Sequence, residues 1–222
     1  MENIVFVLIS AIISLGASAF GIKKLFRKKI PLYFQLLVMA AVCFSLEMLF
    51  TLVGELTEIY DPILNLGMTG SFGCNFFLLS ANYGQLDSII DDNSQNNRMA
   101  RNVAIIAPVL CAAAIASVFI TFANQNLATA IILVLVLLPS CPASYFNLKH
   151  LLLPVDPFGF LEGTKTCNII ALAFYVLNIL YALSVSMDDA MLNGCISILL
   201  AISMGALVLS AVKGVKQWTV SV

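Results

Sequence analysis

The chain has 222 residues, of which 61% are hydrophobic and 10% are charged, with a formal net charge of −1 and a mean hydropathy of +1.00. A soluble domain carries about 25% charged residues, so this chain has too few charges to cover a soluble globule. The composition predicts an integral membrane protein and excludes a nucleic-acid-binding protein, a soluble enzyme and a secreted domain held by disulfides.

Seven stretches of the chain are apolar and long enough to cross a lipid bilayer. A transmembrane helix needs about 20 apolar residues, and continuous stretches favour helices over barrel strands, which alternate in segments of about ten residues. The predicted fold class is all-α: a polytopic membrane protein whose single domain, residues 1–222, is a seven-transmembrane helix bundle. The predicted spans are residues 3–22, 30–53, 62–86, 103–123, 127–147, 166–186 and 190–212.

Charged residues differ between the two ends of these spans. All eleven Lys and Arg residues lie in four segments on one side, 23–29, 98–101, 149–165 and 213–216. The other side carries only acids, namely Glu2, Glu55, Glu58, Asp61, Asp188 and Asp189. Because Lys and Arg concentrate in cytoplasmic loops, we expect the N-terminus outside and the C-terminus inside, in the plasma (inner) membrane of a bacterium.

Small residues recur at helical spacing in two of the spans. Gly67, Gly70 and Gly73 occur in the third span, and serines recur every four residues in the first, at Ser10, Ser14 and Ser18. Small residues allow helices in a membrane to approach closely. We therefore expect these positions to pack against other helices, and the third span to be the central, most enclosed one.

Polar residues inside the spans need a partner or a purpose, because they are costly in hydrocarbon. Glu47 is the one acid well inside a span, and no Lys or Arg within the membrane is available to pair with it. Residues at a similar depth on other spans either line one cavity open to the outside or form an internal hydrogen-bond cluster. The candidate ligand-binding residues are Glu47, Thr69, Asn75, Tyr175, Asn178, Tyr181 and Ser197.

The single histidine gives little support for catalysis. A catalytic zinc site needs three protein ligands and an open position, whereas this chain has only His150, beside Lys149. We expect His150 to lie at the surface, at the level of the lipid headgroups. With no pairing of nucleophile and base in view, we predict neither an enzyme nor a bound cofactor or metal.

Two segments on the inner side are predicted to be non-helical. Residues 91–102 are Asn-rich and lack apolar periodicity, and Pro154 and Pro157 make a continuous helix unlikely between Lys149 and Lys165. Contact with a cytoplasmic signalling partner and a simple connecting role are both compatible with these segments.

The second and third spans resemble the seven-transmembrane N-terminal sensory region of some bacterial histidine kinases. The resemblance rests on LLVMAAVCFSLEMLF, an acidic outer segment and LNLGMTGSFGCNFFLLSANYGQLD, which includes a Leu-x-x-Gly start and an aromatic–Gly pair at the end. It implies an outward-facing sensor that transmits ligand binding inward through helix shifts. No segment of the 222 residues is expected to form that family's output domain, which leaves two alternatives: signalling through a partner, or a fragment of a longer protein.

The leading functional hypothesis is a receptor-like sensory module. It would lie in the lipid bilayer, bind a small molecule from outside in the outer half of the bundle, and signal to a cytoplasmic partner. The alternative is a small-solute transporter with a 3+1+3 helix arrangement and Glu47 as its coupling group.

Overall fold

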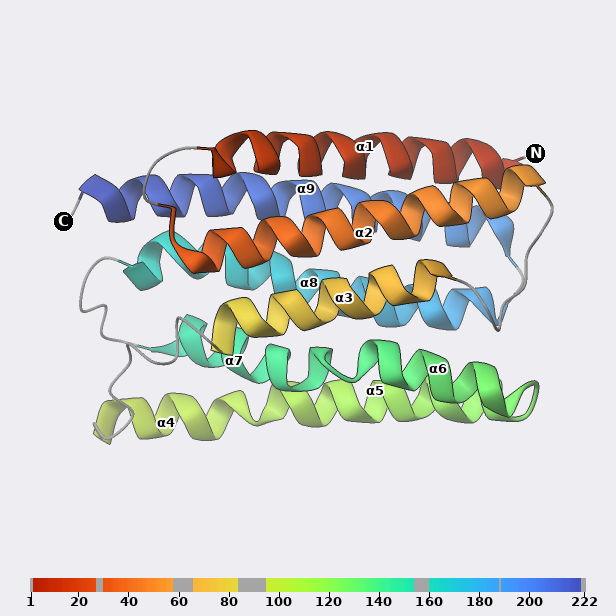
Figure 1. The fold of residues 1–222 in the computed structure, drawn as a ribbon. Helices are drawn as coiled ribbons and strands as arrows, with labels where there is room; N and C mark the ends of the chain where they lie inside the picture. Colours follow the sequence, from red (N-terminus) through yellow and green to blue (C-terminus); the bar gives the residue numbers. More distant parts are fainter. Residues whose placement is uncertain are drawn as a thin grey trace.

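The computed structural model describes residues 2–26, 30–57, 66–83, 95–153, 160–187 and 189–220 (Figure 1). Within these ranges the regular secondary structure is helical and no strand occurs. The helices are α1 (Glu2–Leu25), α2 (Leu32–Thr57), α3 (Leu66–Ala81), α4 (Gln95–Ala104), α5 (Ile106–Ala123), α6 (Leu127–Leu137), α7 (Ser140–Leu152), α8 (Phe160–Val185) and α9 (Ala190–Val220).

The helices lie side by side along one common axis. Figure 1 shows α4 continuing into α5, and α6 into α7, in the same direction, while the other helices alternate in direction. The two termini lie at opposite ends of the bundle. The hairpin between α5 and α6 lies at the end where the chain begins.

Six helical segments are long and apolar enough to cross a membrane, which confirms the prediction of a multi-pass helical membrane protein. The described residues thus contain one such segment fewer than the seven predicted spans. The third span corresponds to α3, which has only sixteen residues and is too short to be counted as a crossing. Part of the predicted third span, residues 62–65 and 84–86, lies outside the described residues. The six segments are Ile4–Leu25, Leu32–Thr57, Asn97–Ala123, Leu127–Leu152, Thr164–Val185 and Ala190–Gly214.

The prediction of a non-helical linker over residues 91–102 is wrong from Gln95 onward. These residues form α4, which buries Asn97, Ala100 and Ala104. Their spacing of three and four residues places them on one helical face. Two of the three are alanines, so the face is too small and too polar to register as an apolar stripe in the sequence.

The prediction for His150 is also wrong. Helix α7 continues to Leu152, five residues beyond the predicted end of the fifth span, and both Lys149 and His150 are fully buried in its last turn. Likewise, α8 begins at Phe160, within the predicted connector. Pro154 and Pro157 lie outside the described residues, so the interruption they predict is untested.

Gly70 allows α3 to pack tightly against α2. A Cβ atom at Gly70 would lie 2.7 Å from the carbonyl oxygen of Cys43 and 2.9 Å from the Cβ of Glu47. The predicted close approach is therefore confirmed. One face of α3 is nevertheless open, since Thr69, Phe72 and Phe76 are exposed, and that α3 is the most enclosed helix stays a prediction.

The serines of α1 face other helices, as predicted. Ser10, Ser14 and Ser18 are all buried. The hydroxyls of Ser18 and Ser45 share a hydrogen bond of 2.6 Å, which joins α1 to α2. Polar contacts of this kind stabilise helix pairs where no water is present to compete.

Replacing Gly194 by Ala is expected to lower stability, because a Cβ there would overlap the ring of Phe6 on α1 and lie 2.7 Å from its Cβ. Overpacking of this kind typically costs about 1–3 kcal/mol. The matched control is Gly16→Ala, where no atom lies within 4 Å of the added carbon. The measurement is the midpoint of thermal unfolding in lipid nanodiscs, and equal midpoints for the two variants would contradict the α1–α9 packing.

Candidate functional site

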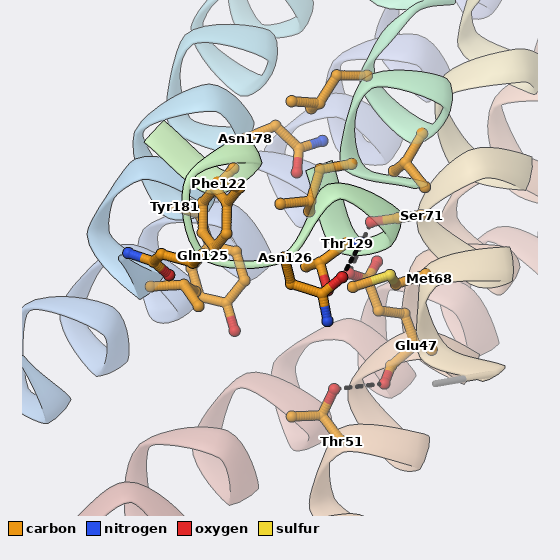
Figure 2. Close-up of a pocket in the computed structure, with 16 residues that line it drawn as sticks. Glu47, Thr51, Met68, Ser71, Phe122, Gln125, Asn126, Thr129, Asn178 and Tyr181 are labelled. Atoms are coloured by element: carbon orange, nitrogen blue, oxygen red, sulfur yellow. Dashed lines mark hydrogen bonds between the residues drawn. The ribbon is translucent and has the colours of Figure 1, made fainter. Parts of the chain in front are cut away.

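A cavity of about 340 Å³ lies among α2, α3, α6 and α8, beside the α5–α6 hairpin (Figure 2). It is at the end of the bundle where α2 ends and the chain begins. Its polar lining residues are Glu47, Thr51, Ser71, Gln125, Asn126, Thr129, Asn178 and Tyr181. Met68, Phe122, Leu133 and Val136 contribute apolar surface.

Glu47 is held in place by neighbouring groups on α2 and α3. The Ser71 hydroxyl donates a 2.6 Å hydrogen bond to Oε1 of Glu47, and the Thr51 hydroxyl donates to the Glu47 backbone carbonyl at 3.0 Å (Figure 2). The close approach at Gly70 brings Ser71 within reach of the carboxyl group. Oε2 of Glu47 is buried and has no hydrogen-bond partner among the described residues. One carboxyl oxygen of this cavity-lining residue is therefore left without a described hydrogen-bond partner.

The wall opposite Glu47 is formed by α8 and the start of α6. Figure 2 shows Asn178 and Tyr181 on one side of the cavity, and Glu47, Met68 and Ser71 on the other. Asn126 caps α6, its side-chain oxygen accepting from the backbone N–H of Ala128 at 2.9 Å and of Thr129 at 3.3 Å. Capping satisfies donors that a helix start leaves free, and it fixes the hairpin at the rim of the cavity.

Buried amides extend from the cavity toward the other end of the bundle. Asn178 donates to the Asn75 side-chain oxygen at 3.5 Å, and Asn75 donates to the carbonyl of Val136 at 3.2 Å. Further along, Asn147 donates to the Tyr175 hydroxyl at 3.4 Å and accepts from Asn82 at 2.8 Å. We call these two groups, made of Asn75, Asn82, Asn147, Tyr175 and Asn178, the polar chain; its members come from α3, α7 and α8, apart from Asn82, which directly follows α3.

The structure brings four of the seven candidate site residues together. Glu47, Asn178 and Tyr181 line the cavity, and Asn75 accepts a hydrogen bond from Asn178. Tyr175 is buried further along α8, where its hydroxyl accepts from Asn147.

The other two candidates lie elsewhere. The Thr69 side chain is exposed on the outer face of α3. The Ser197 hydroxyl lies 2.8 Å from that of Ser10, on the far side of α2. Counting residues along the spans places Thr69 and Ser197 at about the same depth in the membrane as Glu47. The direction in which each side chain points depends instead on which helices are its neighbours.

Several cavity residues were missed by sequence reasoning. Ser71 follows Gly70 directly, and the same glycine spacing that predicts close packing identifies it as a neighbour of the opposing helix. Asn126 precedes the apolar run that starts at Leu127, which is a typical signal for a helix cap. Gln125 and Thr129 carry no comparable signal, because they reach the cavity only through the geometry of the hairpin.

The lining favours recognition over bond chemistry. Among the lining residues that the structure describes, Glu47 is the one acid, and Lys, Arg and His are absent. Across all described residues, no three His, Cys, Asp or Glu side chains gather in a way that could hold a metal ion. The groups on offer are one carboxyl, several amides and hydroxyls, and two aromatic rings.

The contact between Asn82 and Asn147 is expected to couple α3 to α7. In a double-mutant cycle, Asn82→Ala and Asn147→Ala should be non-additive by about 0.6–1.7 kcal/mol, the range for hydrogen bonds between membrane helices. Asn82→Ala combined with Asn124→Ala is the control, since Asn124 is exposed in the hairpin and the two effects should add. The measurement is unfolding free energy in mixed micelles, and additivity in both pairs would contradict the coupling.

Comparisons of the chain with protein-family models, with curated proteins and with solved structures find no match. The resemblance to kinase sensory regions therefore stays a prediction, and function has to be argued from the cavity and its surroundings.

Proposed function

We propose that the chain is a seven-pass sensory module that binds a small molecule from outside the cell and transmits the event to its cytoplasmic end. The observation that carries this proposal is the cavity containing Glu47, with two groups of hydrogen-bonded side chains, Asn178–Asn75 and then Tyr175–Asn147–Asn82, placed successively toward the opposite end of the bundle. Buried polar groups in this number are costly to maintain in a membrane. Their cost suggests a role beyond packing.

The arrangement of α3 supports a seventh crossing. Although α3 spans only about 24 Å by its length, it packs along α2 and runs in the opposite direction to it (Figure 1). The termini lie at opposite ends of the bundle, as an odd number of crossings requires.

The distribution of charge supports the proposed orientation. The basic residues among those that the structure describes belong to the end of the bundle where α1 and α9 finish. They are Lys23, Lys24, Arg98, Arg101, Lys149, Lys165, Lys213 and Lys216. Glu55 and Asp189 belong to the other end. Under the positive-inside rule the cavity then faces the outside.

Transmission through the polar chain requires two packings of the bundle. A ligand shifts such an equilibrium only by its difference in affinity for the two states. A molecule that contacts Glu47 and Asn178 touches both α2 and α8, and Asn178 in turn bonds Asn75 of α3. A change in the spacing of α8 and α3 would reach Asn82 and Asn147 at the inner end.

Reporter tags test the proposed topology. A tag inserted near Thr57 should be reached by a membrane-impermeant reagent on intact cells, while a tag near Asn96 should be reached only after permeabilisation. Labelling of both tags in intact cells would overturn the orientation and with it the outward-facing cavity.

A small-solute transporter is the second candidate, because the polar chain extends well beyond the cavity. The two functions separate in proteoliposomes. A sensor is expected to bind compounds, which raises the midpoint of its thermal unfolding, and to show no net uptake of them into the vesicles. The binding should be lost in Glu47→Gln and kept in Glu55→Gln. Glu55 is the matched control, being an acid on the same helix that does not line the cavity. Uptake that disappears in Glu47→Gln and survives in Glu55→Gln would establish the transporter instead.

A further inference from the structure

We infer that the cavity binds a small organic ammonium ion, with Glu47 as its charge partner and aromatic side chains around its apolar part. This inference rests on the proposed function, in that it names the class of ligand that the outward-facing cavity takes.

Among the described residues, the carboxyl group of Glu47 has no cationic partner. Ser71 occupies Oε1, while Oε2 is buried without a hydrogen-bond partner in the part of the chain that the structure describes. The described cavity lining contains no Lys, Arg or His, and the described basic residues belong to the opposite end of the bundle. A buried charge is tolerated when it is paired, and an N–H donor of an ammonium ion would supply both the charge and the missing hydrogen bond.

The remaining walls favour an organic cation over a bare metal ion. Phe122 and Tyr181 line the cavity, and cations are attracted to the faces of aromatic rings. Asn178 and Asn126 offer amide groups to polar substituents, but a second carboxylate is not among the described lining residues. Calcium takes six to eight oxygen ligands, which a single carboxylate and scattered amides do not provide. A volume of about 340 Å³ fits a molecule with one ring or a short branched chain.

The charge at the mouth of the cavity favours the same class of ligand. Glu55 and Asp189 belong to the cavity end of the bundle. The described residues of that end include no Lys or Arg. A surface of one sign raises the local concentration of ions of the opposite sign. Cations are therefore enriched, and anions depleted, where ligands approach.

Three probes of similar shape test the inference on the full chain in zwitterionic nanodiscs. They are 2-phenylethylammonium, the neutral 2-phenylethanol and the anionic phenylacetate, each titrated while the unfolding midpoint is followed. The ammonium ion is expected to bind the wild-type chain about tenfold or more tightly than the alcohol, because hydrogen bonds to charged groups contribute about 1.5–3 kcal/mol. Phenylacetate is expected to give no shift.

Variants assign the binding to the cavity. Glu47→Gln should weaken ammonium binding about tenfold or more, while Glu55→Gln, which removes an acid of the same end that does not line the cavity, should weaken it much less. Should Glu47→Gln fail to fold, Phe122→Leu provides the second test, because loss of the ring should weaken ammonium binding by about threefold or more and leave binding of the alcohol less affected.

Three results would overturn the inference. These are equal or tighter binding of the alcohol or phenylacetate, ammonium binding that survives both Glu47→Gln and Phe122→Leu, and an equal shift from sodium chloride alone. Binding of the alcohol or phenylacetate that depends on Glu47 would reject the ammonium ion yet leave the sensory proposal standing. The sensory proposal itself would be overturned only by the tag-labelling and uptake results described above.

Discussion

The structure depends on one constraint, which is that hydrocarbon offers no hydrogen-bond partners. Every polar side chain within a span must therefore find a partner inside the protein. The serines of α1 meet this requirement through hydrogen bonds to backbone carbonyls of their own helix and to serines of neighbouring helices. Ser18 pairs with Ser45 of α2, and Ser10 pairs with Ser197 of α9. The amides of Asn75, Asn147 and Asn178 meet it through hydrogen bonds between helices, whereas the buried amide of Asn168 on α8 has no hydrogen-bond partner among the described residues. Glu47 meets it only in part, because one carboxyl oxygen bonds Ser71 and the other lies in the wall of a cavity without a described partner.

The two hydrophobic clusters of the bundle differ in how they are built. The larger cluster joins α1, α2, α3, α8 and α9 and includes Ala143 of α7. Alanines and close helix contacts at Gly70 and Gly194 bring backbones together there. The smaller cluster joins α5, α6 and α8, beside a bundle edge where the helices are interrupted at Ile105 and at Leu138–Pro139. A proline removes a backbone hydrogen bond and loosens the helix that contains it. The cavity lies between the two clusters, and α8 belongs to both, so a change in the cavity is well placed to alter how the clusters pack.

Much of the fold could be predicted from the sequence, because the cost of placing charges in hydrocarbon is large and acts on each residue independently. The depth of Glu47 and of Asn178 in the membrane follows from counting along the spans, and both residues line the cavity. The directions of Thr69 and Ser197 could not be obtained in this way. A span that is apolar all round has no marked face, so its rotation is decided by shape and by small residues on neighbouring helices. Helix α4 and the burial of His150 were missed for a related reason: alanines and amides can pack within a membrane protein without forming an apolar stripe.

The central claim is that α3 turns one face to a water-accessible cavity and the adjacent face to lipid. Labelling of single introduced cysteines tests this claim most directly. Ser71 is buried at the cavity and Phe72, the next residue, is exposed on the outer face of α3. In a background whose six native cysteines are replaced, Ser71→Cys should react with a membrane-impermeant thiol reagent added outside intact cells. Phe72→Cys should not react, because thiols in hydrocarbon are not ionised to the reactive thiolate. Reaction of Phe72→Cys with Ser71→Cys protected would contradict the account.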